Sequence, residues 1–216
     1  MNNSNSGWLK FKIFSFRFLK GAQNKLKYGS YGPQFGELIY INPQNHSTGL
    51  PFKHRSFSGV VLGGDWDLQK QINIEESVIY KACSSHWVEN VPWEETGIYQ
   101  YMLDKIERFG GEVDNCTNIN DIIIRYSKLD KLYEEVKKSK RFKTQRELNF
   151  WNFNEHGGLL FHIDRNNNPI YGAGGMHRFA MAKVLGLKVI PAQLGVVHKE
   201  AIKSWKTHKK IDVFEE

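Results

Sequence analysis

The 216-residue sequence contains few of the residues that mark several common protein classes. It has two cysteines, Cys83 and Cys116, which are too few for a disulfide framework and do not form a metal-binding pattern. No apolar run approaches the roughly 18 residues that a membrane-spanning helix needs. The N-terminus also lacks the apolar segment and cleavage site of a signal peptide. With 40% hydrophobic and 25% charged residues, the composition predicts a globular protein of a reducing cytoplasm.

Acidic residues are absent from residues 1–31, which carry six lysines and arginines of a chain whose net charge is +7. The rest of the chain is almost neutral, which counts against an extended nucleic-acid-binding face. Five aromatic residues are interleaved with these cations: Trp8, Phe11, Phe14, Phe16 and Phe18. Residues 8–27 therefore suit an anionic membrane surface at the inner face of the membrane. An N-terminal strand or hairpin whose aromatic side chains pack on the domain explains the pattern equally well.

Hydrophobic patterning divides the remaining chain into a sheet and a helical insertion. We expect short strands at residues 38–41, 59–62, 158–163, 170–171 and 188–194. The 59–62 strand is expected to be buried, the last strand is interrupted by Pro191, and residues 44–58 look irregular. Apolar residues recur at helical spacing over about 75–140, including a helix that opens at Pro92–Thr96. The predicted fold is α/β, with a basic aromatic segment (1–31) and a single domain (32–216).

A glycine-rich turn at Gly172–Gly175 leads directly into a helix expected over residues 177–185. Glycines allow positive φ and close approach of a ligand to the backbone. The first N–H groups of a helix lack intrahelical acceptors, and the helix dipole favours an anion there. His177 and Arg178 lie in the first turn, and the Arg178 guanidinium suits a phosphate. The turn therefore predicts a phosphate site formed by Gly174, Gly175, Met176, His177 and Arg178.

The stretch Tyr171–Pro191 resembles the ParB/sulfiredoxin-like superfamily. The shared features are a strand, Gly-x-His-Arg, a helix with small residues, Leu-Gly-Leu, and Ile-Pro on a following strand. With its flanking strands the resemblance covers about 40 residues, roughly Gly157 to Lys199, and implies a small mixed sheet with a helical insertion, in which the turn binds nucleotide phosphates. Activities in that superfamily include nucleotide hydrolysis in DNA partitioning, ATP-dependent repair of a sulfinic acid, phosphorylation of free serine, and nuclease activity.

Two departures narrow what the resemblance implies. Sulfiredoxin has a catalytic cysteine before its His-Arg pair, where this chain has Met176, and a thioether cannot act as a thiolate nucleophile. ParB itself continues into a helix-turn-helix domain, and only about 25 residues follow Pro191 here. The chain is therefore more similar to uncharacterised ParB-like proteins and to the free-serine kinase branch. Three further elements look like those of ParB-like proteins: Gly63–Asp67, Trp93–Thr96 and Thr144–Leu148.

Other polar residues are candidates for catalysis, each with a structural alternative. Asp65 and Asp67 follow a strand end and could bind Mg²⁺ or act as base, or could simply belong to a turn. The acidic side chains of Glu94 and Glu95 could be catalytic, or could interact with the dipole at the start of a helix. Arg146 could supply a second phosphate-binding cation, and a capping box between Thr144 and Glu147 is the alternative there.

Two further segments are interpreted as structural, and one histidine is a weaker candidate. Residues 155–157 read as a polar loop and His162 as a packed or exposed strand residue, while His198 is a minor candidate beside the turn. The spacing of the histidines predicts no structural zinc.

These observations together predict a nucleotide-dependent phosphotransferase, a kinase that uses ATP or another nucleoside triphosphate with Mg²⁺. Gly174, Gly175, Met176, His177, Arg178 and Arg146 would contact phosphates, and Asp65, Asp67 and His177 would be catalytic. The acceptor would be a small molecule or a glycan or lipid head group. A ParB-like nuclease or DNA-associated protein and a non-catalytic nucleotide-binding module are the alternatives.

Overall fold

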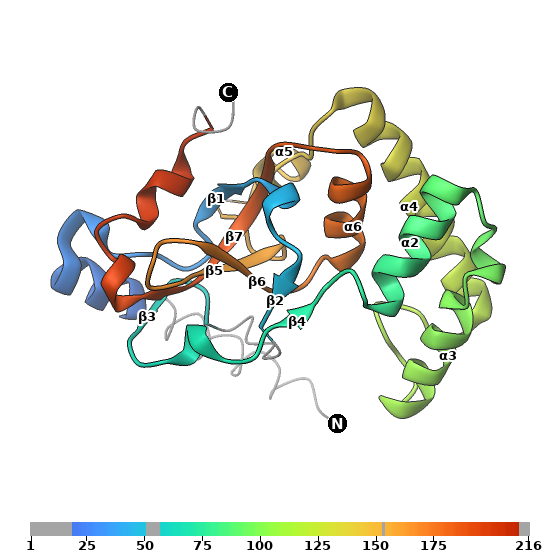
Figure 1. The fold of residues 1–216 in the computed structure, drawn as a ribbon, viewed down its shortest axis with the longest axis horizontal. Coiled ribbons are helices and arrows are strands. Elements are labelled where there is room, and N and C mark those ends of the chain that lie inside the picture. Colours follow the sequence, from blue (N-terminus) through green and yellow to red (C-terminus); the bar gives the residue numbers. More distant parts are fainter. Residues whose placement is uncertain (1–18, 51–56, 153, 212–216) are drawn as a thin grey trace.

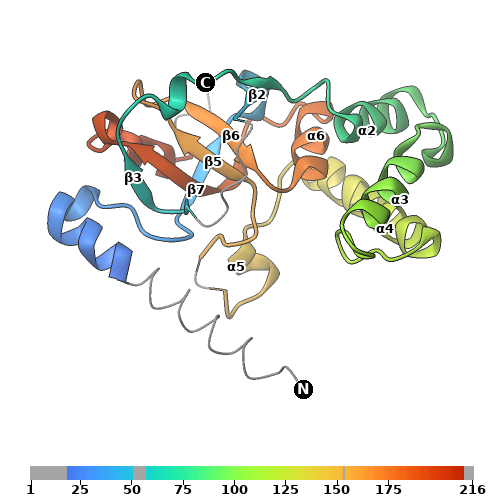
Figure 2. The same ribbon diagram turned by 90° about the horizontal axis from the view of Figure 1, so that it is seen from below.

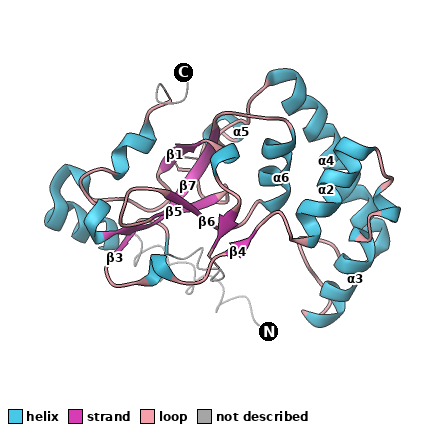
Figure 3. Ribbon diagram, in the orientation of Figure 1, coloured by secondary structure: helices cyan, strands magenta, loops and turns pink. Residues whose placement is uncertain are grey.

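The protein has a mixed β-sheet on one side and a group of helices on the other, with helix α6 (Met176–Val184) between them (Figures 1 and 3). The computed structural model describes residues 19–50, 57–152 and 154–211. The α/β class predicted from the sequence is confirmed. Within these ranges, no helix is both long and apolar enough to cross a membrane.

Seven strands form the sheet, in the order β1-β7-β5-β6-β2-β4, with β3 beside β7. The strands are β1 (Leu38–Ile41), β2 (Thr48–Gly49), β3 (Val60–Leu62), β4 (Ile72–Asn73), β5 (Leu160–Ile163), β6 (Pro169–Ala173) and β7 (Ile190–His198). Strand β7 is parallel to β3 and β5 and antiparallel to β1. All nine of its residues are buried, so β7 is the central strand of the sheet.

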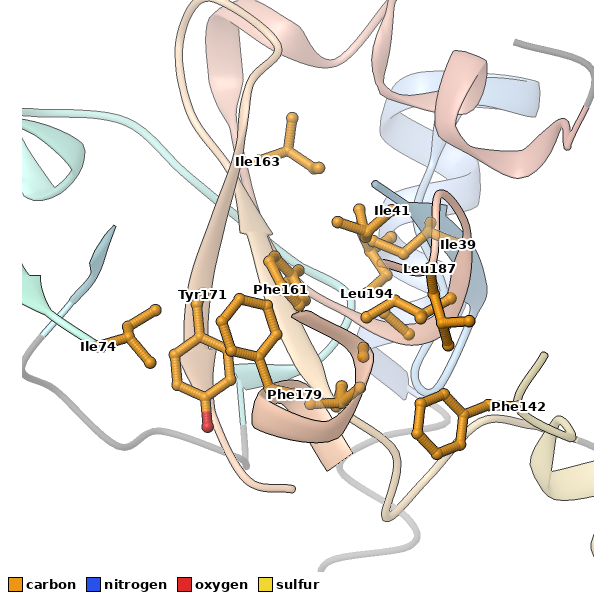
Figure 4. Close-up of a cluster of buried hydrophobic side chains, with 14 of the residues drawn as sticks. Ile39, Ile41, Ile74, Phe142, Phe161, Ile163, Tyr171, Phe179, Leu187 and Leu194 are labelled. Carbon is orange, nitrogen blue, oxygen red and sulfur yellow. The ribbon is translucent and has the colours of Figure 1, made fainter. Parts of the chain in front are cut away.

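Alternate residues of the central strands form a hydrophobic core against α6. Figure 4 shows Ile41, Phe161, Leu194 and Phe179 among the side chains of this cluster, and each of them is fully buried. Side chains alternate between the two faces of a strand, so Leu160 and Gln193 lie on the opposite face. Gln193 faces Leu160 in the parallel pairing of β7 and β5.

Three helices form the second part of the molecule: α2 (Val78–Glu89), α3 (Ile98–Arg108) and α4 (Ile119–Ser139). The side chains of Ser77 and Asn118 accept hydrogen bonds from helical N–H groups and so cap α2 and α4. A second core fills the space between the helices and includes Cys83, Met102 and Tyr126. Both cores include residues of α6, which contributes Phe179 to the first and Ala180 to the second.

The segments near both ends of the described chain are attached to the sheet side. Residues 19–28 are helical, and the buried side-chain amide of Asn24 donates to the carbonyls of Pro33 and Gly59, at 2.8 and 2.7 Å. The indole of Trp205, in the 3₁₀ segment η7 (Trp205–Lys209), donates to the carbonyl of Tyr31 at 2.7 Å. The aromatic residues at 8–18, on which the membrane and hairpin hypotheses depend, lie outside the described residues.

Several sequence-based expectations need correction. Pro191 does not interrupt the last strand, because it pairs with Tyr40 of β1 before the pairing with β5 begins at Gln193. Strands β2 and β4, the first of them within a segment expected to be irregular, were missed because each is two residues long. Gly97, at φ +77°, separates the 3₁₀ turn η5 (Trp93–Glu95) from α3, so no single helix opens at Pro92. Strand β3 is buried at Val60 only, and Leu62 is 39% exposed.

Candidate functional site

The glycine-rich turn lies between the end of β6 and the start of α6, as the sequence predicts. Gly174 and Gly175 have φ values of +76° and +64°, which L-residues with side chains rarely adopt. A Cβ atom at Gly175 would also lie 3.1 Å from Leu159. Gly175 is the N-cap residue of α6 and has no side chain to cap the helix. The first N–H groups of α6 therefore lie beside a bare backbone turn, the arrangement that binds anions at helix N-termini.

The side chain of Arg178 lies across this turn. Its guanidinium donates to the carbonyl of Gly157 at 2.8 Å, in the loop that precedes β5. Its Nε atom is 3.5 Å from the position that a Cβ of Gly175 would occupy. The residue is half-buried, so part of the guanidinium faces solvent. Arg178 thus places a positive charge at the N-terminus of α6, where it interacts with the carboxyl group of Glu155.

Glu155 lies close to the turn and is a candidate that the sequence did not indicate. The residue is 3% exposed, and its Oε2 accepts from the backbone N–H of Gln145 at 2.9 Å. Burial raises the pKa of Glu155, and the hydrogen bond from Gln145 and, to a smaller extent, the positive charge of Arg178 oppose this effect in part. A buried carboxyl group with a raised pKa beside an arginine is typical of a general acid or base.

Gln193 places a buried amide next to the same loop. Its Oε1 accepts from the N–H of Gly157 at 3.2 Å, and the residue is only 3% exposed. Its Nε2 has no hydrogen-bond partner among the described residues. A buried donor without a partner is costly, so this amide is available to a ligand or a water molecule.

A large cleft of about 1360 Å³ is lined by Glu155, by residues of β1, by the start of β7, and by α5 (Gln145–Leu148) with the segment before it. The cleft is lined by five basic side chains and three acidic ones. They are Lys140, Arg141, Arg146, Lys188, Lys209, Glu37, Glu147 and Glu155. Ion pairs join Arg141 to Glu147 and Lys209 to Glu37, so the cleft retains a positive balance. Of the residues described around the turn, only Glu155 lines the cleft, which otherwise reaches α6 at its C-terminal end, at Leu185 and Gly186.

His177 does not face this site. Its ring is 6% exposed, and its Nε2 lies 2.9 Å from the hydroxyl of Tyr126 on α4. Burial is the main reason that the pKa of His177 falls to about 4, and the charge of Arg125 lowers it further. The imidazole is therefore neutral at pH 7 and holds α6 against the helical part. The predicted phosphate-binding and catalytic role of its side chain does not fit this position.

Asp65 and Asp67 form an ionic cluster with Arg165 instead of an open metal site. The Asp67 carboxylate accepts from the backbone N–H and the guanidinium of Arg165 at 2.8–3.1 Å, and Asp65 accepts from the same guanidinium at 2.8 Å. These hydrogen bonds lower the pKa of Asp67 to about 2 against the opposing effect of burial. A Mg²⁺ ion would have to displace the guanidinium, and no group of three potential ligand side chains exists among the described residues. The two residues do not fit the predicted magnesium site.

The cluster also lies away from the glycine turn. Leu160 of β5 pairs with Ala173, next to the turn, while Ile163 at the other end of β5 precedes Arg165 by two residues. Strand β5 alone separates the two places by about 10 Å. His198 belongs to the same far end, since its Nε2 lies 4.0 Å from Asp67. The structure therefore does not bring Asp65 or Asp67 together with Arg178.

The other candidate residues have structural surroundings that account for them. Thr144 and Glu147 form the expected capping box of α5, and Arg146 is exposed at the cleft. Glu94 and Glu95 are exposed in a 3₁₀ turn. His162 is buried where Cβ atoms at Gly172 and Gly195 would clash with its ring.

Both cysteines are poor nucleophiles in this fold. Cys83 and Cys116 are buried, and burial raises the pKa of each thiol. Neither therefore provides a thiolate at neutral pH.

No protein-family model, curated protein or solved structure matches this chain. The resemblance to the ParB/sulfiredoxin-like superfamily therefore rests on the residues of Tyr171–Pro191 themselves.

Proposed function

We propose that this protein binds the phosphates of a nucleotide at the N-terminus of α6 and transfers a phosphoryl group to an acceptor in the adjacent cleft. The observation that supports this most directly is the turn itself. Two glycines at positive φ open a nine-residue helix, and Arg178 lies across them. Backbone donors, the helix dipole and a guanidinium converge there, and all three favour the same kind of ligand.

Phosphoryl transfer depends mainly on positioning and charge neutralisation, which this site can provide without a covalent intermediate. In the proposed complex, the N–H groups of the first turn of α6 contact phosphate oxygens. Arg178 exchanges its bond to the Gly157 carbonyl for a bond to a phosphate, because a charged acceptor binds a guanidinium more strongly than a neutral one. The amide of Gln193 supplies one further donor near Gly157.

Glu155 is the proposed general base of this reaction. It lines the cleft and is buried, and its raised pKa lies closer to pH 7 than the pKa of an exposed glutamate. In this role it accepts the proton of the acceptor hydroxyl as that oxygen attacks the terminal phosphorus, while the bond from phosphorus to the bridging oxygen breaks and the nucleoside diphosphate leaves. The cleft is large enough for a small molecule or a glycan or lipid head group. No protein ligand is assigned to Mg²⁺, because Asp65 and Asp67 bind Arg165.

A non-catalytic nucleotide-binding module is the second candidate. It is favoured by the separation of Asp65 and Asp67 from the turn. Both predicted metal ligands pair with Arg165 and so have a structural role, which leaves the turn without a metal ligand from either of them. The two candidates differ in Glu155, which would be dispensable in a binding module.

Thermal-shift titration with ATP, ADP, CTP and GTP, each with Mg²⁺, tests the shared part of both proposals. A nucleotide at 100 times its dissociation constant stabilises the folded state by about 2.7 kcal/mol. For a chain of this size, that raises the melting temperature by roughly 5–10 °C. If none of the four nucleotides raises it, both proposals are wrong. If one does, release of its terminal phosphate to a hydroxyl acceptor separates the enzyme from the module.

A further inference from the structure

A short, hydrogen-bonded projection exposes three large apolar side chains beside α5. Leu148, Phe150 and Trp151 are 58%, 74% and 76% exposed. We refer to these three residues as the apolar tip. Figure 2 shows α5 and the following turn standing off below the sheet and the helices. Side chains of this size are seldom this exposed together in a soluble domain unless the surface has a partner.

The backbone holds the tip in this exposed position. The N–H of Asn152 donates to the carbonyl of Asn149 at 2.8 Å, which closes a turn with Phe150 and Trp151 at its two central positions. The Asn149 side chain accepts from the N–H of Trp151 at 3.1 Å, and the Asn152 side chain donates to the carbonyl of Gln145 at 3.3 Å. These bonds fasten the turn to the capped helix α5, so the aromatic side chains are presented on an ordered support.

The segment that leads to the tip is strongly basic. Residues 137–146, which we call the basic run, contain six lysines and arginines and no acidic residue. All six side chains are exposed, while Phe142 in their midst is buried in the main core. Within the described residues, Lys137 pairs with Glu134 and Arg141 with Glu147, and the other four form no ion pair.

We propose that the basic run and the apolar tip together form a docking surface for an anionic membrane. Each lysine or arginine near such a surface is attracted by its negative potential, while Leu148, Phe150 and Trp151 enter the headgroup boundary. Cations with aromatic residues also suit single-stranded nucleic acid, which binds in a basic groove with bases stacked on rings. The tip is a projection and includes the aliphatic Leu148, which favours a lipid surface. This inference does not depend on the proposed phosphotransferase activity.

Co-sedimentation of the full chain with vesicles tests the proposal. The protein should pellet with equimolar phosphatidylglycerol–phosphatidylcholine vesicles and not with phosphatidylcholine alone, and added salt should weaken the binding. Residues 1–31 are also basic, so pelleting of the wild-type protein does not by itself show that the basic run and the apolar tip bind the vesicles. The double variant Phe150→Ser, Trp151→Ser should lower the partition coefficient on the order of tenfold, because it removes the apolar contribution of the tip.

Phe109→Ser is the matched control, because Phe109 is 64% exposed at the end of α3, whereas the basic run begins at the C-terminal end of α4. Its partition should equal that of the unchanged protein. Quenching of tryptophan fluorescence by brominated lipid adds a local readout, which Trp151→Phe should reduce while pelleting persists. Wild-type partition of the double variant overturns the proposal. Failure to bind anionic vesicles, with tip-dependent binding of a single-stranded oligonucleotide instead, overturns it in favour of nucleic acid.

Discussion

The variant Asp67→Asn tests whether Asp67 has a structural role or binds a metal ion. The side chain is 2% exposed, and Arg165 lowers its pKa from 3.8 to about 2. One pKa unit corresponds to about 1.4 kcal/mol, so the charged form of Asp67 contributes on the order of 2 kcal/mol to the free energy of unfolding at pH 7. Asp67→Asn should therefore lower the melting temperature by roughly 4–8 °C.

The pH dependence of this effect has a defined sign. Because the pKa is lower in the folded state, the stabilisation is complete above about pH 4 and is lost as the pH falls towards 2. The difference between wild type and Asp67→Asn should shrink over that interval. Asp65→Asn is the matched control, since Asp65 contacts the same guanidinium but its side chain is 79% exposed. Its effect should stay within about 0.5 kcal/mol.

Thermal denaturation followed by circular dichroism measures both variants. If Asp67→Asn is as stable as wild type and nucleotide turnover is lost, the carboxylate acts on a ligand and the structural explanation is refuted.

Three further predictions concern the neighbourhood of the turn. His177→Phe should cost about 1 kcal/mol of stability through the lost bond to Tyr126, yet leave nucleotide affinity unchanged; a large loss of affinity would return His177 to the binding site. Glu155→Gln should bind nucleotide normally and lose phosphoryl transfer, whereas normal turnover would exclude Glu155 as the base. Serine variants of Cys83 and Cys116 should keep any turnover, because both thiols are buried and their pKa values are raised; a protein–thiol intermediate in the wild type would contradict this.

Features determined by neighbouring residues could be predicted from the sequence. The strands at 38–41, 158–163 and 170–171 follow from short apolar runs bounded by glycine, proline and polar residues. The turn at Gly174–Gly175 follows from two glycines directly before a helical pattern, and the capping box from the spacing of Thr144 and Glu147. Each of these depends on interactions within a few residues, which local patterns report well.

Partners that are distant in the sequence could not be predicted. Arg165 follows Asp67 by 98 residues, and only the arrangement of β3, β7 and β5 brings them together. The sequence indicates only a loop residue at Glu155. Local patterns do not show that its carboxylate accepts from the N–H of Gln145, ten residues earlier at the start of α5. His177 and Ala180 are three positions apart and so share the face of α6 that meets the helical part. Arg178, one position further along than His177, lies on the side of Gly157.

The central claim is that the N-terminus of α6 binds nucleotide phosphates with the help of Arg178. Isothermal titration calorimetry of the best nucleotide from the thermal-shift screen tests it in wild type, Arg178→Ala and the control Arg108→Ala, which removes an exposed arginine from α3. We expect wild-type affinity in the control. A charged hydrogen bond contributes about 1.5–3 kcal/mol, so Arg178→Ala should bind at least about tenfold more weakly. Equal affinity in all three proteins would contradict the assignment of this turn.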